Sequence, residues 1–183
     1  MNYAPGEIRV YDANSDFKIT AEDRVFIGYG VPKWSGSVNS NMAFKGVDLS
    51  FFISTRQGFT INDGQGGGLH FEGRYNGKKV DYWTPTNTTA KYPRPRDGRQ
   101  TPLNYGTMYY QDGSYVRIRH ITLGYSFDNK LLSLMRLQQL RLYVTAQNPF
   151  LFTSFDGSDP DGSTGHNSYP SIKSFLFGLN VTF

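Results

Sequence analysis

The sequence lacks cysteine altogether among its 183 residues. This absence excludes disulfides, thiol nucleophiles, cysteine zinc sites and cysteine-ligated iron–sulfur clusters. Only 19% of the residues are charged, so the composition is not that of a disordered polyelectrolyte. No apolar run approaches the ~20 residues that a membrane helix needs. The opening residues, MNYAPGEIRVYD, lack the apolar stretch of a signal peptide. Taken alone, these absences are typical of a soluble protein.

Basic residues exceed acidic ones by only four, 19 against 15. The densest basic group comprises Lys91, Arg94, Arg96 and Arg99. No nucleic-acid-binding motif accompanies this group, so we interpret it as a solvated loop and predict no nucleic-acid partner. The three histidines are isolated from one another, and the GQGGG segment is not followed by the lysine and serine of a phosphate loop. We therefore predict that the chain is not an enzyme.

The dominant sequence period is two, which indicates β-strands. Apolar and small polar residues alternate from Trp34 to Phe44 and again from Val47 to Arg56, with Phe52 as an exception. Lys45-Gly46 between the two runs predicts a tight turn and therefore a hairpin. Alternation returns in Tyr115–Phe127, where its phase flips near His120, which indicates either a β-bulge or a change of environment along the strand. Two later runs, around residues 140–147 and 174–183, alternate in the same way.

The lengths of these runs and of the connections between them indicate the fold class. The runs are on the order of ten residues, the length of tilted membrane strands rather than of ordinary strands. Short connections at 45–46 and 128–139 alternate with long ones at 57–114 and 153–170. Outer-membrane barrels show the same asymmetry. We predict an all-β fold, with antiparallel strands of a transmembrane β-barrel and long extracellular loops. A soluble β-sandwich explains the alternation equally well, and both interpretations stand at this point.

Several segments together resemble one protein family. YVRIRHITLGYSF, LRLYVTAQNPFLFT and FLFGLNVTF resemble the C-terminal end of SusC/RagA-type TonB-dependent outer-membrane transporters. VPKWSGSVNSNMAFKGVDLSFF resembles a hairpin of the same family, and the YWTPTN and YPRP segments resemble one of its loops. The matches occur in family order and cover nearly the whole chain.

This resemblance implies a location and a set of partners. Such transporters are barrels of about 22 strands with an N-terminal plug in the bacterial outer membrane. They import glycans or other nutrients, such as peptides, that a SusD-like surface lipoprotein delivers, and TonB drives them through their N-terminal part. On this basis, residues 1–33 form an extracellular loop and residues 34–183 form about five C-terminal strands in contact with outer-membrane lipid. The smallest closed membrane barrel has about eight strands. We therefore expect a fragment that is inactive in transport alone, and the alternative is a soluble all-β glycan-binding module.

The segment DANSDFKITAED has the spacing of a calcium loop. Asp12, Asn14, Asp16, Thr20 and Asp23 occupy positions 1, 3, 5, 9 and 12 of such a loop, and Lys18 offers its carbonyl at position 7. Phe17 stands where the sharp turn calls for glycine. Two hypotheses remain open, a calcium site and a degenerate acidic turn. No other cofactor is predicted.

Four further groups of residues carry specific predictions. Tyr82, Trp83 and Tyr92 are candidates for stacking on sugar rings, with loop packing as the favoured alternative. Asp156, Asp159 and Asp161 are interpreted as a polar turn cluster rather than as a catalytic or calcium-binding one. The resemblance implies that the last strand is an assembly signal, formed by Phe175, Phe177, Leu179, Val181 and Phe183. The alternation predicts that one face exposes Leu49, Phe51, Leu123, Leu142, Val144, Leu179 and Val181 to lipid.

Overall fold

The structure is a computed structural model that describes residues 4–62, 81–95, 105–157, 159–161 and 171–183. The described residues separate into two compact units. The first unit lies within Met1–Gly30 and Thr60–Gln111, and the second within Val31–Phe59, Asp112–Gly162 and Tyr169–Phe183. Each unit is considered by itself below.

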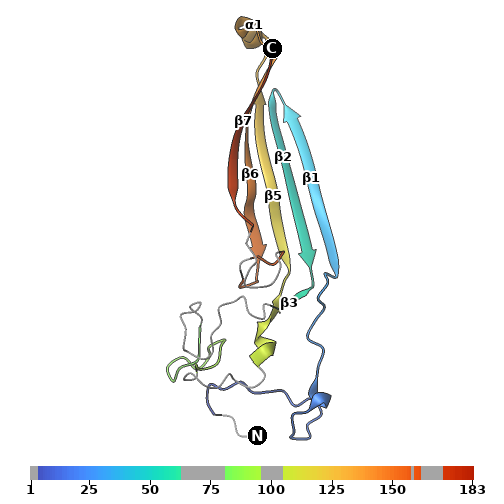
Figure 1. Cartoon of the computed structure of the whole chain (residues 1–183), viewed down its shortest axis with the longest axis vertical. Helices are drawn as coiled ribbons and strands as arrows, with labels where there is room; N and C mark the ends of the chain where they lie inside the picture. The colour runs from blue at the N-terminus through green and yellow to red at the C-terminus, as the bar shows by residue number, and fades with distance from the viewer. Residues whose placement is uncertain (1–3, 63–80, 96–104, 158, 162–170) are drawn as a thin grey trace. The chain divides into compact units, whose positions relative to one another are not determined.

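The second unit is built on one antiparallel sheet of five strands (Figure 1). Its strands are β1 (Trp34–Phe44), β2 (Val47–Gln57), β5 (Tyr115–Ser126), β6 (Gln139–Thr153) and β7 (Ser174–Thr182). The strands lie in the order β1-β2-β5-β6-β7, so each strand pairs with its neighbours in the order of the chain. Four of the five are 11 or more residues long, which exceeds the usual five to six or so. The predicted all-β antiparallel fold with five long strands is confirmed.

The first hairpin turns at Lys45-Gly46, as predicted. Both residues have positive φ, 47° and 84°, which a two-residue hairpin turn of the favoured twist requires. The carbonyl of Gly46 also accepts a hydrogen bond from the amide of Ser126 on β5 at 2.7 Å. A Cβ at position 46 would lie 2.7 Å from the Ser126 carbonyl oxygen, so glycine is required there both for conformation and for space.

A β-bulge interrupts strand β5 where the apolar phase flips. His120 pairs with Phe52 on β2, but Ile53 pairs with Ile118, so Arg119 is an extra residue between them. The pairing of β5 with β6 shifts at the same place. The bulge compensates for the change of phase and keeps the apolar residues of β5 on one side of the sheet. Of the two interpretations of the phase flip near His120, the bulge is confirmed.

The connection between β5 and β6 contains the helix α1 (Asn129–Met135). The carboxylate of Asp128 accepts a hydrogen bond from the amide of Leu131 and caps the helix N-terminus. Figure 1 shows α1, the C-terminus and the β1–β2 turn at the same end of the sheet, called the turn end below. The opposite end, from which residues 154–173 connect β6 to β7, is called the loop end.

The remaining elements are short. They are the 3₁₀ turns η1 (Ala21–Asp23) and η2 (Tyr105–Tyr109) and the strands β3 (Thr60–Asn62) and β4 (Tyr110–Asp112), which pair with each other. Few apolar side chains are buried among the described residues; they are Phe59, Ile61, Tyr92, Tyr115, Leu132 and Phe155. No helix among the described residues has the length and apolarity needed to cross a membrane.

Candidate functional site

One side of the five-stranded sheet, called the apolar face, is covered by hydrophobic side chains. Residues paired directly across antiparallel strands point to the same side, so the register identifies this face. Its central residues are Val38, Met42, Leu49, Phe51, Ile53, Leu123, Ile121, Ile118, Leu142, Val144, Ala146, Phe177, Leu179 and Val181. The seven residues predicted to share one lipid-facing side are all among them. Ser40 is a polar interruption in β1.

This apolar face is exposed. Phe177 is 83% exposed, Leu179 58% and Leu123 48%. A soluble sandwich would cover such a face with a second sheet and leave its central residues buried. The exposure excludes that arrangement for the described residues and leaves an apolar surface that lipid would cover.

Aromatic side chains mark both ends of the apolar face. The turn-end group comprises Phe44, Tyr125 and Phe127, and the loop-end group comprises Trp34, Phe150 and Phe152. Phe51, Phe175 and Phe177 lie between these groups. The ten steps along β1 between its two end aromatics span about 33 Å at ~3.3 Å per residue. A tilt of about 40° reduces this to roughly 25 Å, the height of the apolar band of a membrane barrel.

The opposite side of the sheet, called the polar face, carries hydroxyl, amide and charged side chains. Among them are Ser37, Asn39, Asn41, Ser50, Ser54, Thr122, Thr145, Gln147 and Asn180. Thr122 and Thr145 share a hydrogen bond of 2.8 Å between their hydroxyls. Phe52, the exception noted in the sequence, lies on this face and stacks on His120 with ring centroids 5.9 Å apart.

An ion pair crosses a whole strand on the polar face. The guanidinium of Arg141 on β6 donates two hydrogen bonds to Asp48 on β2, at 2.9 and 2.6 Å. Gly124 on β5 lies between the two strands, and a Cβ there would overlap both side chains. The ring of Tyr143 crosses Gly178 in the same way. Glycine in these strands therefore makes room for large polar side chains of neighbouring strands.

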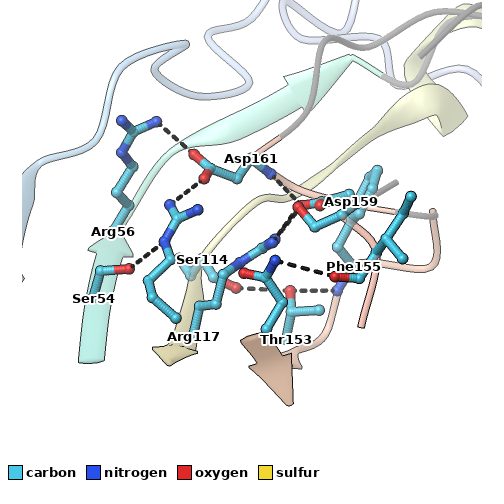
Figure 2. A network of polar contacts seen from close by, with 12 residues as sticks. Ser54, Arg56, Ser114, Arg117, Thr153, Phe155, Asp159 and Asp161 are labelled. Carbon is cyan, nitrogen blue, oxygen red and sulfur yellow. Dashed lines mark hydrogen bonds and ion pairs between the residues drawn. The ribbon is translucent and has the colours of Figure 1, made fainter. Parts of the chain in front are cut away.

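A buried ion pair fastens the segment after β6 to the loop end of the polar face (Figure 2). Arg117 on β5 donates a hydrogen bond to Asp159, and the side chains of the pair are only 2% and 6% exposed. Arg117 also donates to the hydroxyl of Ser171 at 2.6 Å. Asp159 in turn accepts from the amides of Asp161 at 2.9 Å and Ser171 at 3.0 Å. The pair thus joins the sheet to both sides of the β6–β7 connection.

A second, more exposed pairing lies beside it. Asp161 accepts a hydrogen bond from Arg56 on β2 at 2.9 Å and one from Arg119 on β5 at 2.5 Å. The Nε of Arg119 also donates to the hydroxyl of Ser54 at 3.1 Å. Arg119 is the bulge residue of β5, so the bulge directs its side chain toward this aspartate. We call Asp159, Asp161 and the arginines 56, 117 and 119 the loop anchor.

Apolar packing supports the loop anchor. Tyr115, 2% exposed, meets Phe59 edge to face with ring centroids 6.5 Å apart. The guanidinium of Arg117 lies over the Tyr115 ring, 5.5 Å from its centroid. Phe155 is buried as well, and a Cβ at Gly157 would overlap its ring. The loop end therefore contains most of the buried aromatic residues of the second unit, and this packing excludes water from the Arg117–Asp159 pair.

Both aspartates of the loop anchor are held in the ionised form. Burial alone would raise the pKa of Asp159, but hydrogen bonds from Arg117 and Ser171 outweigh it and hold the pKa far below 3.8. Burial also acts to raise the pKa of Asp161, and hydrogen bonds from Tyr115 and Arg119, with the charges of the arginines, lower it. Both carboxylates are therefore charged at every physiological pH.

The loop anchor was not recognised in the sequence. The prediction of a polar turn at Asp159 and Asp161 does not include their arginine partners. One signal in the sequence points to the pairing: Arg117 and Arg119 are two apart in a strand with no other Lys, Arg, Asp or Glu, and the aspartates have the same spacing. A charged residue in such a strand requires a partner. The pairing itself spans 42 positions, which local pattern analysis does not reach.

The calcium-like segment folds in the first unit with features of the predicted loop. Phe17 has φ 66°, the left-handed conformation that its position in a calcium loop demands, and Ser15 has φ 63°. The carboxylate of Asp12 accepts hydrogen bonds from the amides of Ser15 at 2.7 Å and Phe17 at 2.8 Å. The sequence therefore keeps the sharp turn without the glycine, at a cost of about 1–2 kcal/mol.

The last acidic residue of this segment already has partners within the protein. Asp23 and Thr20 form a capping box at η1, in which Asp23 accepts from the Thr20 amide at 2.7 Å. This hydrogen bond and one from the Ala13 amide lower the pKa of Asp23, although burial opposes them. Among the described residues, no three His, Cys, Asp or Glu side chains are grouped closely enough to hold a metal ion. Calcium binding by Asp12, Asn14, Asp16, Lys18 and Asp23 stays a prediction.

The three aromatic residues considered for sugar stacking differ in exposure. Tyr92 is 8% exposed and forms a parallel bridge with Tyr82. The indole of Trp83 lies against Gly6, where a Cβ would come within 2.6 Å of the ring. Near them Arg94 pairs with Glu7 at 3.0 Å. Tyr82, 46% exposed, presents the most accessible ring of the three, while Trp83 and Tyr92 contribute to packing within the first unit.

The predicted assembly strand coincides with β7. Phe175, Phe177, Leu179 and Val181 pair with Ala146, Val144, Leu142 and Leu140 of β6. All four therefore lie on the apolar face, and Phe183 follows the strand at the turn end with 84% of its surface exposed. The alternation required of the signal is present, while its role in assembly stays a prediction.

Known proteins are similar to this chain in sequence and in fold. TonB-dependent receptor P3 of Formosa agariphila is 30% identical over 200 residues, a match that covers 98% of this chain and 19% of that protein. TonB-dependent receptor SusC of Bacteroides thetaiotaomicron is 38% identical over 82 residues, covering 41% of this chain and 8% of that protein. A weaker match, 24% identical over 129 residues, is to a lactamase-like protein of Trichophyton rubrum. No protein-family model matches the chain.

The RagAB peptide importer in its closed-closed state is similar in structure, with a TM-score of 0.71 and 22% identity. That match covers 91% of this chain and 19% of the importer chain. This structural match and the two unlike faces of the sheet together identify the class of fold: the long strands are those of a transmembrane β-barrel. The chain belongs to the TonB-dependent receptors of the SusC/RagA family and spans about a fifth of the length of the curated relatives that match nearly all of it. The resemblance seen in the sequence is confirmed.

We expect Asp159→Asn to destabilise the loop end of the sheet by about 3–5 kcal/mol, because it leaves the charge of Arg117 buried without a counter-charge. Asp161→Asn is the matched control, since its arginine partners are partly exposed, and we expect about 1 kcal/mol or less. Hydrogen exchange of the amides in 154–161 measures both. Equal protection in the two variants would contradict the buried-pair interpretation.

The loop anchor also predicts a pH dependence. The pKa values of Asp159 and Asp161 are lower in the folded than in the unfolded protein, where the ordinary value is 3.8. Their contribution is therefore complete above pH 3.8 and is lost as the pH falls below it toward the folded values. Exchange of the loop amides should be unchanged between pH 5 and 7, after correction for intrinsic rates, and should rise below about pH 4. Opening at pH 5–6 would contradict this assignment.

For the calcium-like loop, we expect Phe17→Gly to bind calcium more tightly than the parent protein, because glycine adopts the left-handed conformation without a steric penalty. A relief of about 1–2 kcal/mol corresponds to roughly a tenfold gain in affinity. Isothermal titration of both proteins with calcium measures the difference. Asp12→Asn serves as the control that weakens any true site, and equal or weaker binding by the glycine variant would contradict the loop assignment.

Proposed function

We propose that the chain forms five neighbouring strands in the wall of a TonB-dependent nutrient importer of the bacterial outer membrane. The observation that carries this proposal is the sheet with two unlike sides. Its apolar face is exposed and bounded by aromatic residues, and its polar face carries hydroxyl, amide and charged groups. In this arrangement the apolar face contacts outer-membrane lipid and the polar face lines the interior of the barrel. A barrel of five strands does not close, so this chain alone does not transport.

The orientation follows from the ends of the sheet. In this proposal the turn end faces the periplasm, because its connections are short, and the loop end faces outward. Residues 1–33 and the loop anchor then lie on the extracellular side, where a SusD-like lipoprotein would deliver glycans or other nutrients. RagAB is described as a peptide importer, which makes peptides a further class of cargo to test. TonB would act on another part of the whole protein, and no catalytic role is proposed for this chain.

The proposal is tested by two neighbouring positions on β6. Val144 lies on the apolar face and Thr145 on the polar face, and the chain has no cysteine of its own. Single variants Val144→Cys and Thr145→Cys, each carrying a nitroxide label, are made in the protein as the cell produces it and placed in phospholipid vesicles. We expect the label at 144 to collide with oxygen dissolved in the membrane, and the label at 145 with a water-soluble nickel chelate. The reverse pattern, or equal access of the two labels to nickel, would refute the proposal that these five strands form part of a barrel wall in the membrane, called the membrane wall below.

A second prediction concerns the last residue. If β7 is the assembly signal, deletion of Phe183 should lower the amount of protein in the outer membrane and increase degraded protein in the periplasm. Immunoblots of the separated fractions measure this. The control is Phe177→Ala, which removes one exposed aromatic ring of β7 while the chain end stays intact. Normal outer-membrane levels after the deletion, or an equal loss in the control, would remove Phe183 from any special role in assembly.

A further inference from the structure

Helix α1 carries an apolar stripe that no described residue covers. Leu131, Leu134 and Met135 are 45%, 86% and 51% exposed. Their spacing of three and four residues places them on one side of the helix. Leu132 lies next to this stripe and is buried at 5% exposure, so the helix is held to the rest of the unit by one residue and presents three others outward.

The helix is well formed, so this exposure is not that of a frayed end. Asp128 caps its first turn, and Arg136 ends it in the left-handed conformation, with its amide donating to the carbonyls of Leu132 and Ser133. The amide of Leu137 donates to the Leu132 carbonyl at 3.0 Å, which completes a C-terminal cap. Local hydrogen bonds therefore fix the direction of the three apolar side chains.

The position of α1 relates it to the apolar face. The helix begins two residues after Phe127, which meets Tyr125 edge to face with ring centroids 5.0 Å apart, in the turn-end aromatic group. Figure 1 places it at the turn end of the sheet, near the C-terminus. In a membrane barrel, aromatic residues at the end of the apolar band lie at the level of the lipid headgroups. A helix that starts two residues beyond them therefore begins near that level.

The charges around α1 match a phospholipid surface. Lys130 and Arg136 are both exposed: Lys130 lies one turn before Leu134, at the edge of the apolar stripe, and Arg136 directly follows the last helical residue. Lys45, in the neighbouring β1–β2 turn, lies over the ring of Phe44 at 5.2 Å from its centroid. Basic side chains beside an apolar stripe are the pattern of helices that lie in the plane of a membrane interface, with cations near the phosphates.

We propose that α1 is an interfacial helix that inserts Leu131, Leu134 and Met135 among the lipids of the leaflet at the turn end, with Lys130 and Arg136 toward the phosphates. The inference rests on the proposed membrane wall and adds a contact outside the barrel strands. Lipid is the occupant because the stripe continues a lipid-facing surface. Three side chains also fall far short of the ~20–30 residues a side that a specific protein interface uses.

The test uses single nitroxide labels at Leu134→Cys and Ser133→Cys in the protein as the cell produces it. Leu134 is the most exposed residue of the stripe, so its replacement leaves the fold intact, and Ser133 is the matched neighbour on the polar side of the helix. The protein is placed in vesicles of phosphatidylethanolamine and phosphatidylglycerol. Collision rates with oxygen and with a water-soluble nickel chelate report the depth of each label. Met135→Cys repeats the measurement at a second stripe position.

We expect the labels at 134 and 135 to show a higher ratio of oxygen to nickel collisions than the label at 133, and a lower ratio than one at Val144. Equal ratios at 133 and 134 would overturn the proposal, because the stripe would then face water. Shielding of the 134 label from both reagents would also overturn it, because a protein surface would then cover the stripe. Failure of the Val144 label to contact lipid would instead refute the membrane wall, so the two failures are distinguishable.

Discussion

The pairing of backbone hydrogen-bonding groups in hydrocarbon determines most of this structure. A bilayer offers no water to an unpaired amide or carbonyl, so strands within it must form long, continuous ladders. The strands β1 and β2 pair over their whole length, and β5 and β6 continue their ladder through a bulge instead of ending it. Because strand side chains alternate, a continuous ladder forces the sequence to separate apolar from polar residues at every second position. Exposure of the apolar face follows from this separation.

The polar face shows where the chain places its charges. Asp48 and Arg141 meet across Gly124, where the missing side chain allows two long polar groups to reach each other over a strand. Arg117 is almost fully buried, and it is tolerated because Asp159 supplies the opposite charge. The energetic consequences differ: the exposed pairs contribute little, whereas the buried pair holds the segment after β6 against the sheet. Paired charges therefore mark the loop end of the polar face, and aromatic residues mark both ends of the apolar face.

The strands were predictable because period-two alternation directly records which side each residue faces. Even the bulge was visible, since the apolar phase flips where Arg119 is inserted. The loop anchor was not, because Arg117 and Asp159 are brought together by the return of a loop, and no local pattern encodes that return. The burial of Tyr92 agrees with loop packing, the alternative favoured from the sequence, although periodicity does not indicate which ring of the loop region is buried.

The need to pair backbone amides and carbonyls applies also to the two outer edges of the sheet. Among the described residues, β1 pairs only with β2, and β7 pairs only with β6. In hydrocarbon both outer edges require further strands, because an unpaired edge would leave a row of amides and carbonyls without partners. The relative that covers nearly all of this chain is about five times as long, which is ample length for such strands. The few buried apolar residues among those described fit the proposed function, because a sheet covered by lipid on one side and by further strands at both edges would need little core of its own.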